Sequence, residues 1–412
     1  MPELQAPVGT FDVLPPESSR YEALVARFAQ HVGRAGYGLV VTPVFEDVSV
    51  FERVGQSTDI VRKEMYDFED KGGRRLALRP EGTASVARAY VQRRPPLPFK
   101  GWYVAAHFRY ERPQAGRYRQ HHQLGVEALG SDDPDLDVEV VALAWTFYAD
   151  LGLRRLHLRL TSLGDAACRP AYRERLRGWL DPRRHELCDE HRGRVDENPL
   201  RVLDCKRPAC RAVSADAPRM LHHLCAECER HFQRVSTGLA ALGVPFELDT
   251  SLVRGLDYYT RTTFELTSDA LEFAHSGAGG GGRYDGLVES LGGPPTPGIG
   301  FGLGIERILL ACDAEGTFPA AGLGLDVFVM DTTGGEAARD VTAELRAAGV
   351  RADRAFDDRS WKAQMKVAVR SGARLAVVVE EGGVSIRTLQ EKGEPEAAER
   401  ISLVDHVKKR LA

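Results

Sequence analysis

The chain has 412 residues, of which 43% are hydrophobic and 28% are charged, and its formal net charge at pH 7 is −4. This length predicts two or three domains with ample material for a buried core. The slightly acidic balance excludes a polycationic protein, so a nucleic-acid site would have to be a local basic patch.

The N-terminal segment, residues 1–20, carries charged residues and no apolar run, which is unlike a signal peptide. The rest of the sequence contains no stretch of about 18 apolar residues, so no membrane span is expected. Seven cysteines in a chain of this length, without a secretion signal, indicate reduced thiols. We therefore expect a cytoplasmic protein that contacts neither membrane nor DNA.

The first half of the chain alternates helical and strand patterns. Apolar residues at helical spacing after Ser18 or Ser19, either of which can cap a helix, predict the first helix. The segments that follow predict strands, one of them interrupted by Pro43, then a turn around Pro80 and a hairpin with a polar loop. The expected elements are a helix over 18–36, strand 37–46, strand–turn–helix 74–91, and two strands in 101–129 joined by loop 111–120.

The second half changes character twice. Residues 166–235 are rich in Arg and Cys and read as a helical insertion, whereas strand and glycine signals return from 246 to 301. A small-residue linker over 313–324 precedes alternating strands and helices, which predict a small α/β domain. We expect a catalytic domain over 1–318, with the insertion at about 166–240, and a C-terminal domain over 325–412.

The strand expected before Leu129 has a polar face. Residues i, i+2 and i+4 of a strand share a face, so Gln123, Gly125 and Glu127 point one way while the apolar residues between them point to the core. A solvated sheet face fits this pattern. The floor of a ligand pocket fits it equally, because glycine lets another group approach the backbone closely.

Glycine recurs at every second position from Gly298 to Gly304, so one face of this strand carries no side chains. Interior strand glycines pack nothing, and the pattern is therefore costly unless another group lies on that face. A flat ligand ring and close helix-on-sheet packing are the two explanations. Glu306 and Arg307 then begin a helix, where Arg307 can contact an adenine or a phosphate.

Arginine is concentrated around the polar loop, with Arg109, Arg112, Arg117 and Arg119 in or beside the hairpin. The planar arginine fork binds phosphate with two parallel hydrogen bonds. Arg109 is expected inside a strand next to Phe108, where an unpaired charge is costly. We therefore expect Arg109 to meet an anionic ligand.

Two further segments gather polar groups at turns. Glu81 and Thr83 stand where a strand passes into a helix, and this is either a helix start capped by Thr83 or part of a site. The segment Leu252–Arg261, which contains Arg254 and two adjacent tyrosines, combines a cation, phenols and a carboxylate in a strand-like run. A pocket for a charged, hydrogen-bonding ligand explains that combination better than a folding core does.

Four cysteines of the insertion, Cys205, Cys210, Cys225 and Cys228, have the spacing of a structural zinc site. A small insertion with little core gains most from a bound metal. Four free thiols are the alternative, and further ligands are available nearby: Cys188, His191, His222, His223 and His231.

A basic stripe is expected in the C-terminal domain. Arg359, Lys362, Lys366 and Arg370 are spaced three, four and four residues apart, which places them on one face of a helix. A solvated helix face explains the spacing equally well. A nucleic-acid contact would supply the local patch that the acidic composition requires.

These segments together resemble class II aminoacyl-tRNA synthetases. "GYGLVVTPVFE", "FRYERPQAGRYRQHHQLGVEALG" and "GIGFGLGIERILL" are similar to the three class II motifs, and "LVRGLDYYTRTTFE" and "GGRYDGL" resemble the two signatures of the histidyl-tRNA synthetase family. The resemblance runs from about Gly9 to the C-terminus. It implies an α+β catalytic core built on an antiparallel sheet flanked by helices, a mainly helical insertion, and an α/β anticodon-binding domain.

The resemblance also implies a reaction and its residues. Histidine and ATP, with Mg²⁺ on the phosphates, would form histidyl-adenylate and pyrophosphate. The histidyl group would then be transferred to the 3′ end of tRNA(His). The resemblance also implies that the enzyme is a homodimer. Arg254 and Arg109 would be catalytic. Histidine would be bound by Glu81, Gly82, Thr83, Arg109, Gln123, Glu127, Arg254, Tyr258, Tyr259 and Tyr284. ATP would be bound by Arg109, Glu111, Arg117, Tyr118 and Arg307, and tRNA by Gln114, Arg119, Gln120, Arg359, Lys362, Lys366 and Arg370.

Two other functions fit parts of this pattern. A regulatory paralogue of ATP phosphoribosyltransferase shares the class II fold, but it typically lacks the anticodon-binding domain and has eroded motifs. A tRNA-binding module without catalysis is the second. We favour the enzyme because every charged group that adenylate formation needs is present.

Overall fold

The computed structural model describes residues 3–55, 58, 60–203, 205, 207–252, 258–271, 277–319, 324–357, 359–389 and 395–412. The chain forms two compact units, one of Met1–Asp12 with Leu24–Pro319 and one of Val13–Ala23 with Ala320–Ala412. No helix in these described ranges is long and apolar enough to cross a bilayer.

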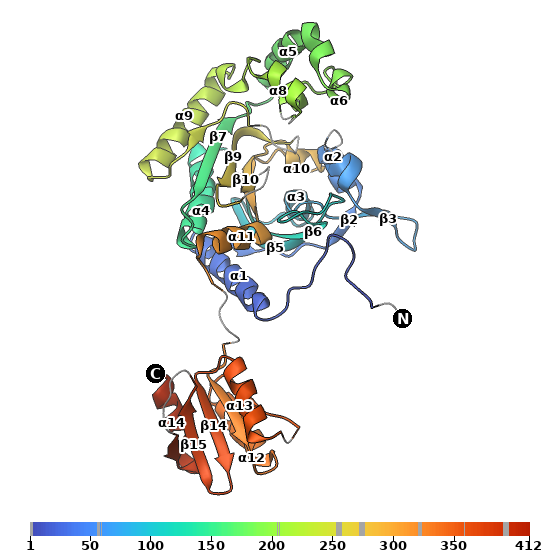
Figure 1. Ribbon diagram of the computed structural model, residues 1–412. Helices are drawn as coiled ribbons and strands as arrows, with labels where there is room; N and C mark the ends of the chain where they lie inside the picture. The colour runs from blue at the N-terminus through green and yellow to red at the C-terminus, as the bar shows by residue number, and fades with distance from the viewer. Residues whose placement is uncertain are drawn as a thin grey trace. The chain divides into compact units, whose positions relative to one another are not determined.

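The first unit is built around an eight-stranded sheet with the order β1-β5-β6-β11-β10-β9-β7-β8 (Figure 1). Its six central strands are antiparallel, and the two short edge strands pair in parallel. The expected hairpin is confirmed, except that Arg109 lies just after its first strand instead of inside it. The strands are β1 Gly38–Leu39, β5 Phe99–Phe108, β6 Gln120–Leu129, β7 Leu156–Ser162, β8 Glu247–Leu248, β9 Thr260–Ser268, β10 Gly277–Arg283 and β11 Gly298–Gly304.

Helices bury the apolar side of this sheet. The ring of Phe28 in α1 (Glu17–Gly33) lies 5.0 Å from that of Phe147 in α4 (Pro134–Asp150) and 6.3 Å from that of Phe301 in β11. In β6 the alternate residues Leu124 and Val126 are fully buried, as the period-two pattern predicts. The opposite face of β6 is therefore free to carry polar side chains.

A smaller sheet of order β2-β4-β3 precedes α3. Pro43 separates β1 from β2, so the single strand expected over 37–46 is two short ones. Arg79 ties this region to the hairpin: its Nε donates to Ala106 O at 2.8 Å and its Nη1 to Thr42 O at 3.0 Å. The elements are β2 Phe45–Asp47, α2 Ser49–Gly55, β3 Asp67–Glu69, β4 Arg75–Leu78, α3 Thr83–Arg93, α10 Leu287–Ser290 and α11 Ile305–Glu315, which takes up the start of the expected linker.

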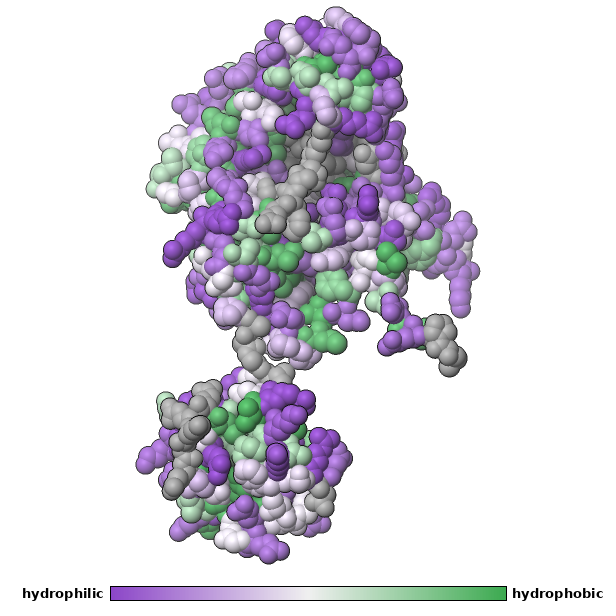
Figure 2. Space-filling model, viewed as in Figure 1, coloured by the Kyte–Doolittle hydropathy of each residue, from purple (hydrophilic) through white to green (hydrophobic). Residues whose placement is uncertain are grey.

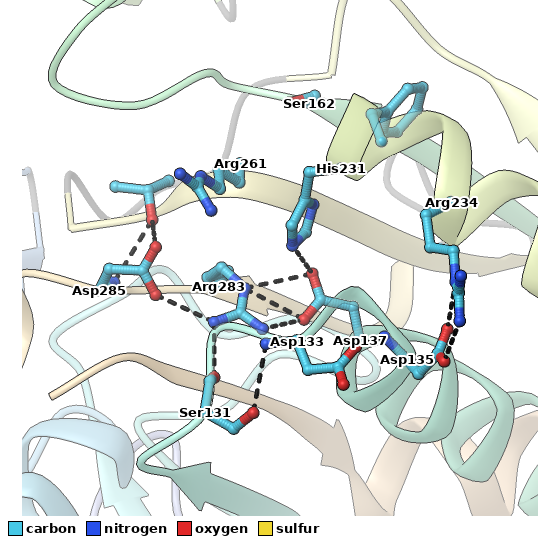
Figure 3. Close-up of polar contacts among 12 residues, drawn as sticks. Ser131, Asp133, Asp135, Asp137, Ser162, His231, Arg234, Arg261, Arg283 and Asp285 are labelled. Carbon is cyan, nitrogen blue, oxygen red and sulfur yellow. Dashed lines mark hydrogen bonds and ion pairs between the residues drawn. The ribbon is translucent and has the colours of Figure 1, made fainter. Parts of the chain in front are cut away.

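The insertion is helical, as expected, and its last helix packs on α4 (Figure 1). A buried ion pair lies at this junction (Figure 3): Arg283 of β10 binds Asp137 of α4, with Nε to Oδ1 at 3.1 Å. His231 Nε2 lies 3.5 Å from Asp137 Oδ2, and burial lowers the pKa of His231. The helices are α5 Arg169–Leu180, α6 Asp189–Arg192, α7 Leu200–Leu203, α8 Pro208–Ser214 and α9 Ala226–Ala241.

The second unit contains a five-stranded sheet of order β13-β12-β14-β15-β16. Core residues of α12 and α14 cover one face and those of α13 the other, which is the layering of an α/β domain. The alternating part was expected, whereas β15, β16 and α14 were not. The elements are β12 Val327–Asp331, α12 Glu336–Ala347, β13 Ala352–Arg354, α13 Trp361–Arg370, β14 Leu375–Glu380, β15 Gly383–Thr388, β16 Glu396–Ala398 and α14 Leu403–Leu411.

Candidate active site

A polar pocket of about 230 Å³ opens on the sheet face formed by β6, β10 and β11. All five side chains expected to bind ATP line it. Gln123 lines it too, and so do two glycines of the β11 stripe, Gly302 and Gly304. The expected ATP-binding residues brought together here are Arg109, Glu111, Arg117, Tyr118 and Arg307.

Backbone carbonyls fix the arginines at the rim of this pocket. Arg307 donates from Nε to Gly116 O at 2.8 Å and from Nη1 to Gly277 O, and its burial lowers its pKa. Arg109 donates from Nε to Pro80 O at 2.9 Å, and no ion pair among the described residues involves it. A guanidinium held by neutral carbonyls keeps its full charge available for an anionic ligand.

The polar loop folds back onto the pocket. Arg117 Nε lies 2.6 Å from Glu111 Oε2, and the ring of Tyr118 lies 4.7 Å from that of Phe11. Gln114, expected to contact tRNA, is exposed and pairs with Arg117 in an isolated bridge. Arg119 stacks over the ring of Tyr110 at 4.0 Å, and its backbone and that of Gln120 both donate to Gly9 O.

Glu127 lies at the centre of a second, closed cluster. The hydroxyl of Thr83 donates to its Oε1 at 2.7 Å, that of Tyr103 reaches the same oxygen at 3.4 Å, and that of Tyr284 donates to Oε2. Burial raises the pKa of Glu127 from its usual 4.5 to about 8. Burial also raises the pKa values of Tyr103 and Tyr284, so both phenols remain proton donors.

Glu81 forms the base of this cluster and caps α3. Its carboxylate accepts from Thr83 N at 2.7 Å and Ala84 N at 2.8 Å, and burial raises its pKa. The cap is therefore Glu81 and not Thr83, whose hydroxyl is directed to Glu127. Gly82 lies between them, and a Cβ there would stand 2.5 Å from the Tyr103 ring.

The glycines opposite this cluster serve the packing of the chain itself. A Cβ on Gly125 would lie 2.3 Å from the Tyr103 ring, and one on Gly298 2.3 Å from the Tyr284 ring. A Cβ on Gly300 would lie 2.0 Å from Glu127 Oε2. Close packing thus explains one end of the stripe, whereas Gly302 and Gly304 line the open pocket and leave room for a ligand.

Aromatic side chains wall the closed cluster. The ring of Tyr258 lies 4.9 Å from that of Tyr259 and 5.9 Å from that of Tyr284, and the Tyr258 hydroxyl reaches Glu81 Oε2 at 3.4 Å. Tyr259 is buried. Arg254, the other expected catalytic residue, lies outside the described residues.

Sequence reasoning missed several lining residues. Tyr103 was hidden because an aromatic residue in an apolar strand reads as core. Its opposing glycines, Gly82 and Gly125, are the signal that could have indicated it. His121, Glu265 and Glu306 line the pocket, and Glu306 accepts from the backbone and ring nitrogens of His122 at 2.9 and 2.8 Å.

The basic residues of the second unit are only partly on one helix face. Lys362, Lys366 and Arg370 are exposed on α13 at intervals of four. Arg359 precedes the helix, and its Nη2 lies 3.1 Å from Asp357 Oδ2. The stripe is thus a three-residue feature of the helix, because the helix begins after Arg359.

The four cysteines expected to share one zinc do not form one cluster in the described part of the chain. Cys205 and Cys210 group with Cys188 and His191, whereas Cys225 and Cys228 group with Asp165 and Cys168. The single site is corrected to two sets, because the fold brings each pair of cysteines to a different earlier segment. His222 and His223 belong to neither set.

The antiparallel sheet, with a closed carboxylate cluster and an arginine-lined pocket on one face, is the catalytic fold of class II aminoacyl-tRNA synthetases. Residues 9–308 match the family described as histidyl-tRNA synthetase. The chain therefore belongs to the histidyl-tRNA synthetase family.

Relatives extend this likeness over nearly the whole chain. A histidine–tRNA ligase of Moorella thermoacetica is 51% identical over 98% of this chain and 97% of its own. One of Saccharopolyspora erythraea is 50% identical over 95% of this chain and 94% of its own. The apo histidyl-tRNA synthetase of S. aureus has a TM-score of 0.83 at 36% identity, covering 98% of this chain and 100% of that one. These matches support a synthetase over the regulatory paralogue.

Proposed function

We propose that this chain activates L-histidine with ATP, releasing pyrophosphate, and transfers the histidyl group to the 3′ end of tRNA(His). The observation that carries the proposal is the arrangement on one sheet face: Gln123 lines the arginine-lined pocket, and Glu127, on the same face of β6, lies at the centre of the closed cluster. Arg109 also lines the pocket and donates to Pro80 O, next to Glu81. Members of this class use ATP with Mg²⁺.

Adenylate formation needs positioning and charge neutralisation more than covalent help. The histidine carboxylate oxygen attacks the α-phosphorus, and the bond to the pyrophosphate oxygen breaks. Arg109 would neutralise charge on the α-phosphate from one side and Arg254 from the other. Glu111 and Glu265 offer oxygen ligands suited to Mg²⁺, which would offset the charge of the phosphates.

The Glu127 cluster would select histidine. The buried carboxyl group of Glu127, which three hydroxyls contact, is completed by an imidazole N–H, which an apolar amino acid of the same size cannot offer. Tyr258, Tyr259 and Tyr284 would enclose the ring. Glu81, Thr83 and Gln123 would receive the α-ammonium group.

We assign tRNA recognition to both units. Residues 325–412 would form the anticodon-binding domain, with Lys362, Lys366 and Arg370 facing the phosphate backbone. Gln114, Arg119 and Gln120 would approach the acceptor end. All seven cysteines are free, which fits the reducing cytoplasm, where we place the reaction.

We also propose a homodimer that forms through the strands after α1. Leu39, Val41, Val44, Phe45 and Phe68 are 43% to 85% exposed. Phe45 of β2 and Phe68 of β3, the strands on either side of β4, pack their rings 6.4 Å apart. Figure 2 shows green residues on the surface in the region of these strands. An apolar patch of this kind favours a protein partner. A monomer at micromolar concentration in sedimentation velocity would rule the dimer out.

The test is ATP–pyrophosphate exchange measured with each of the 20 amino acids. Exchange with histidine alone supports the activity and its specificity together. The Arg254→Ala variant should lose exchange at least about 100-fold, the scale of one lost charge-stabilising group, while tRNA binding is nearly kept. A folded protein that exchanges with no amino acid would overturn the proposal.

We further propose that the insertion binds zinc. The candidate ligands are the two separate groups of cysteines with their neighbours, in place of the single set of four cysteines expected from spacing.

A further inference from the structure

Six of the seven cysteines lie between residues 168 and 228, in or beside the insertion, and none forms a disulfide. The insertion has a small core of its own, to which Cys168, Cys210 and Cys228 contribute buried side chains. Thiols at these positions are placed by several short helices rather than by one. What they can bind depends on how the fold groups them.

The first group joins the middle of the insertion. Cys188 precedes α6, His191 lies in α6, Cys205 follows α7 and Cys210 lies in α8. Their ligand atoms all lie within 4.8 Å of one another, and Cys188 Sγ is 3.1 Å from His191 Nδ1. Three thiols and one imidazole that converge in this way are a common zinc ligand set.

The second group closes the base of the insertion. Asp165 and Cys168 follow β7, whereas Cys225 and Cys228 stand at the start of α9. Cys168 Sγ lies 3.8 Å from Cys228 Sγ and 3.5 Å from Asp165 Oδ1. Zn–S bonds of about 2.3 Å in a tetrahedron place two sulfurs about 3.8 Å apart, so this spacing suits one shared ion.

We propose that the insertion holds two separate zinc centres, one on Cys188, His191, Cys205 and Cys210 and the other on Asp165, Cys168, Cys225 and Cys228. Thiolate-rich tetrahedral sets favour zinc over magnesium or calcium. The inference deepens the zinc part of the proposed function. The zinc count is independent of the ligase activity, whereas the positioning role of the second centre rests on that activity. The first centre fastens the short helices, and the second fastens both ends of the insertion to the sheet.

The second centre also contacts β9 and the residue just before it. Asp165 presents its other oxygen, Oδ2, to Arg261 Nη2 of β9 at 3.2 Å, which orients the ligand as outer partners of metal sites do. Arg169, next to Cys168, donates from Nη1 to Tyr259 O at 2.9 Å. This centre therefore positions the segment that carries Tyr258 and Tyr259.

The test is the zinc content of the full chain, purified without chelator and measured by native mass spectrometry and elemental analysis. We expect two zinc ions per chain, one in Cys210→Ser, one in Cys228→Ser, and none in the double variant. Cys312→Ser, which removes a buried thiol of α11 outside the insertion, should keep both. The proposal would be overturned if the parent held one zinc ion per chain and each single variant held none. That result would indicate one zinc site shared by both pairs of cysteines.

Two further measurements keep the outcome decisive if a variant does not fold. Titration of the intact protein with a mercurial should release two zinc ions as the thiols react. Zinc-free protein whose intact mass reports disulfides would show redox pairs instead and would overturn the proposal. Among folded variants, His191→Cys should keep two ions, and Cys228→Ser should raise the KM for histidine at least threefold more than Cys210→Ser does. Equal KM values would remove the positioning role of the second centre.

Discussion

The two ends of the glycine stripe on β11 look alike in sequence and differ in the structure. At Gly298 and Gly300 the chain covers its own backbone with Tyr284 and Glu127, whereas at Gly302 and Gly304 the same face opens into the arginine-lined pocket. A strand without side chains thus provides dense packing at one end and space for a ligand at the other. Stability should depend on the closed end, and substrate binding on the open one.

The largest effect is expected from the ion pair that anchors β10 beside the closed end. Arg283→Met leaves Asp137 buried and uncompensated, so the free energy of unfolding should fall by about 3–5 kcal/mol in urea titration. Arg234→Ala removes the exposed ion pair with Asp135, which lies on α4 as Asp137 does. This change should lower the free energy of unfolding by only about 0–1 kcal/mol. Figure 3 shows the two pairs. Similar losses of stability in both variants would contradict the expected difference between a buried and an exposed ion pair.

Gly300→Ala tests the closed end directly. The added Cβ would lie 2.0 Å from Glu127 Oε2 and 2.4 Å from Val126 O, and the neighbouring backbone cannot give way cheaply. We expect a loss of about 3 kcal/mol in the free energy of unfolding, at the upper end of overpacking effects. A variant as stable as the parent would show that the Glu127 cluster rearranges easily.

Glu127→Gln probes the charge in the closed cluster. Because burial raises the folded pKa from 4.5 to about 8, the folded state holds a proton that the unfolded state has released between these values. Stability of the parent should therefore fall by a few kcal/mol as pH rises from about 5 to about 8, at up to about 1.4 kcal/mol per pH unit, whereas the glutamine variant lacks this slope. The measurement is thermal and urea unfolding of both proteins at pH 5.5, 7 and 8.5. If the glutamine variant showed the same pH dependence as the parent, another group would be responsible.

Gly304→Ala is the matched change at the open end and should have the smallest effect on stability. Its Cβ would meet nothing closer than 3.8 Å, so the free energy of unfolding should change by no more than about 0.5 kcal/mol. The KM for ATP should nevertheless rise severalfold, because the methyl group enters the pocket, while the KM for histidine changes less. Unchanged ATP kinetics would place the nucleotide elsewhere.

Local patterns predicted the elements with strong periodicity. The hairpin of β5 and β6, helix α12 and the helical insertion follow from alternation, helical spacing and composition. β16 was missed because it is an edge strand of three residues, and β15 because only Val384 and Ile386 mark its apolar alternation. Arg359 was placed on a helix that begins two residues later, since spacing alone does not locate the first turn.

The candidate site was predictable where one strand carried it. Gln123, Gly125 and Glu127 were placed on one polar face, and the residues expected for ATP line a common pocket. Tyr103 was not predicted, because its ring fills the space above Gly82 and Gly125, and only the fold shows which side chain lies above a glycine.

The amino-acid sequence by itself determined the class of fold, the family signatures and the types of ligand the polar residues can hold, because these depend on local periodicity and residue chemistry. Only the tertiary structure decided which groups meet. Glu81 rather than Thr83 caps α3, and Cys168 and Cys188 join cysteines from later segments. The physical reason is that contacts between distant segments depend on how the helices and strands pack, and spacing along the chain does not record that packing.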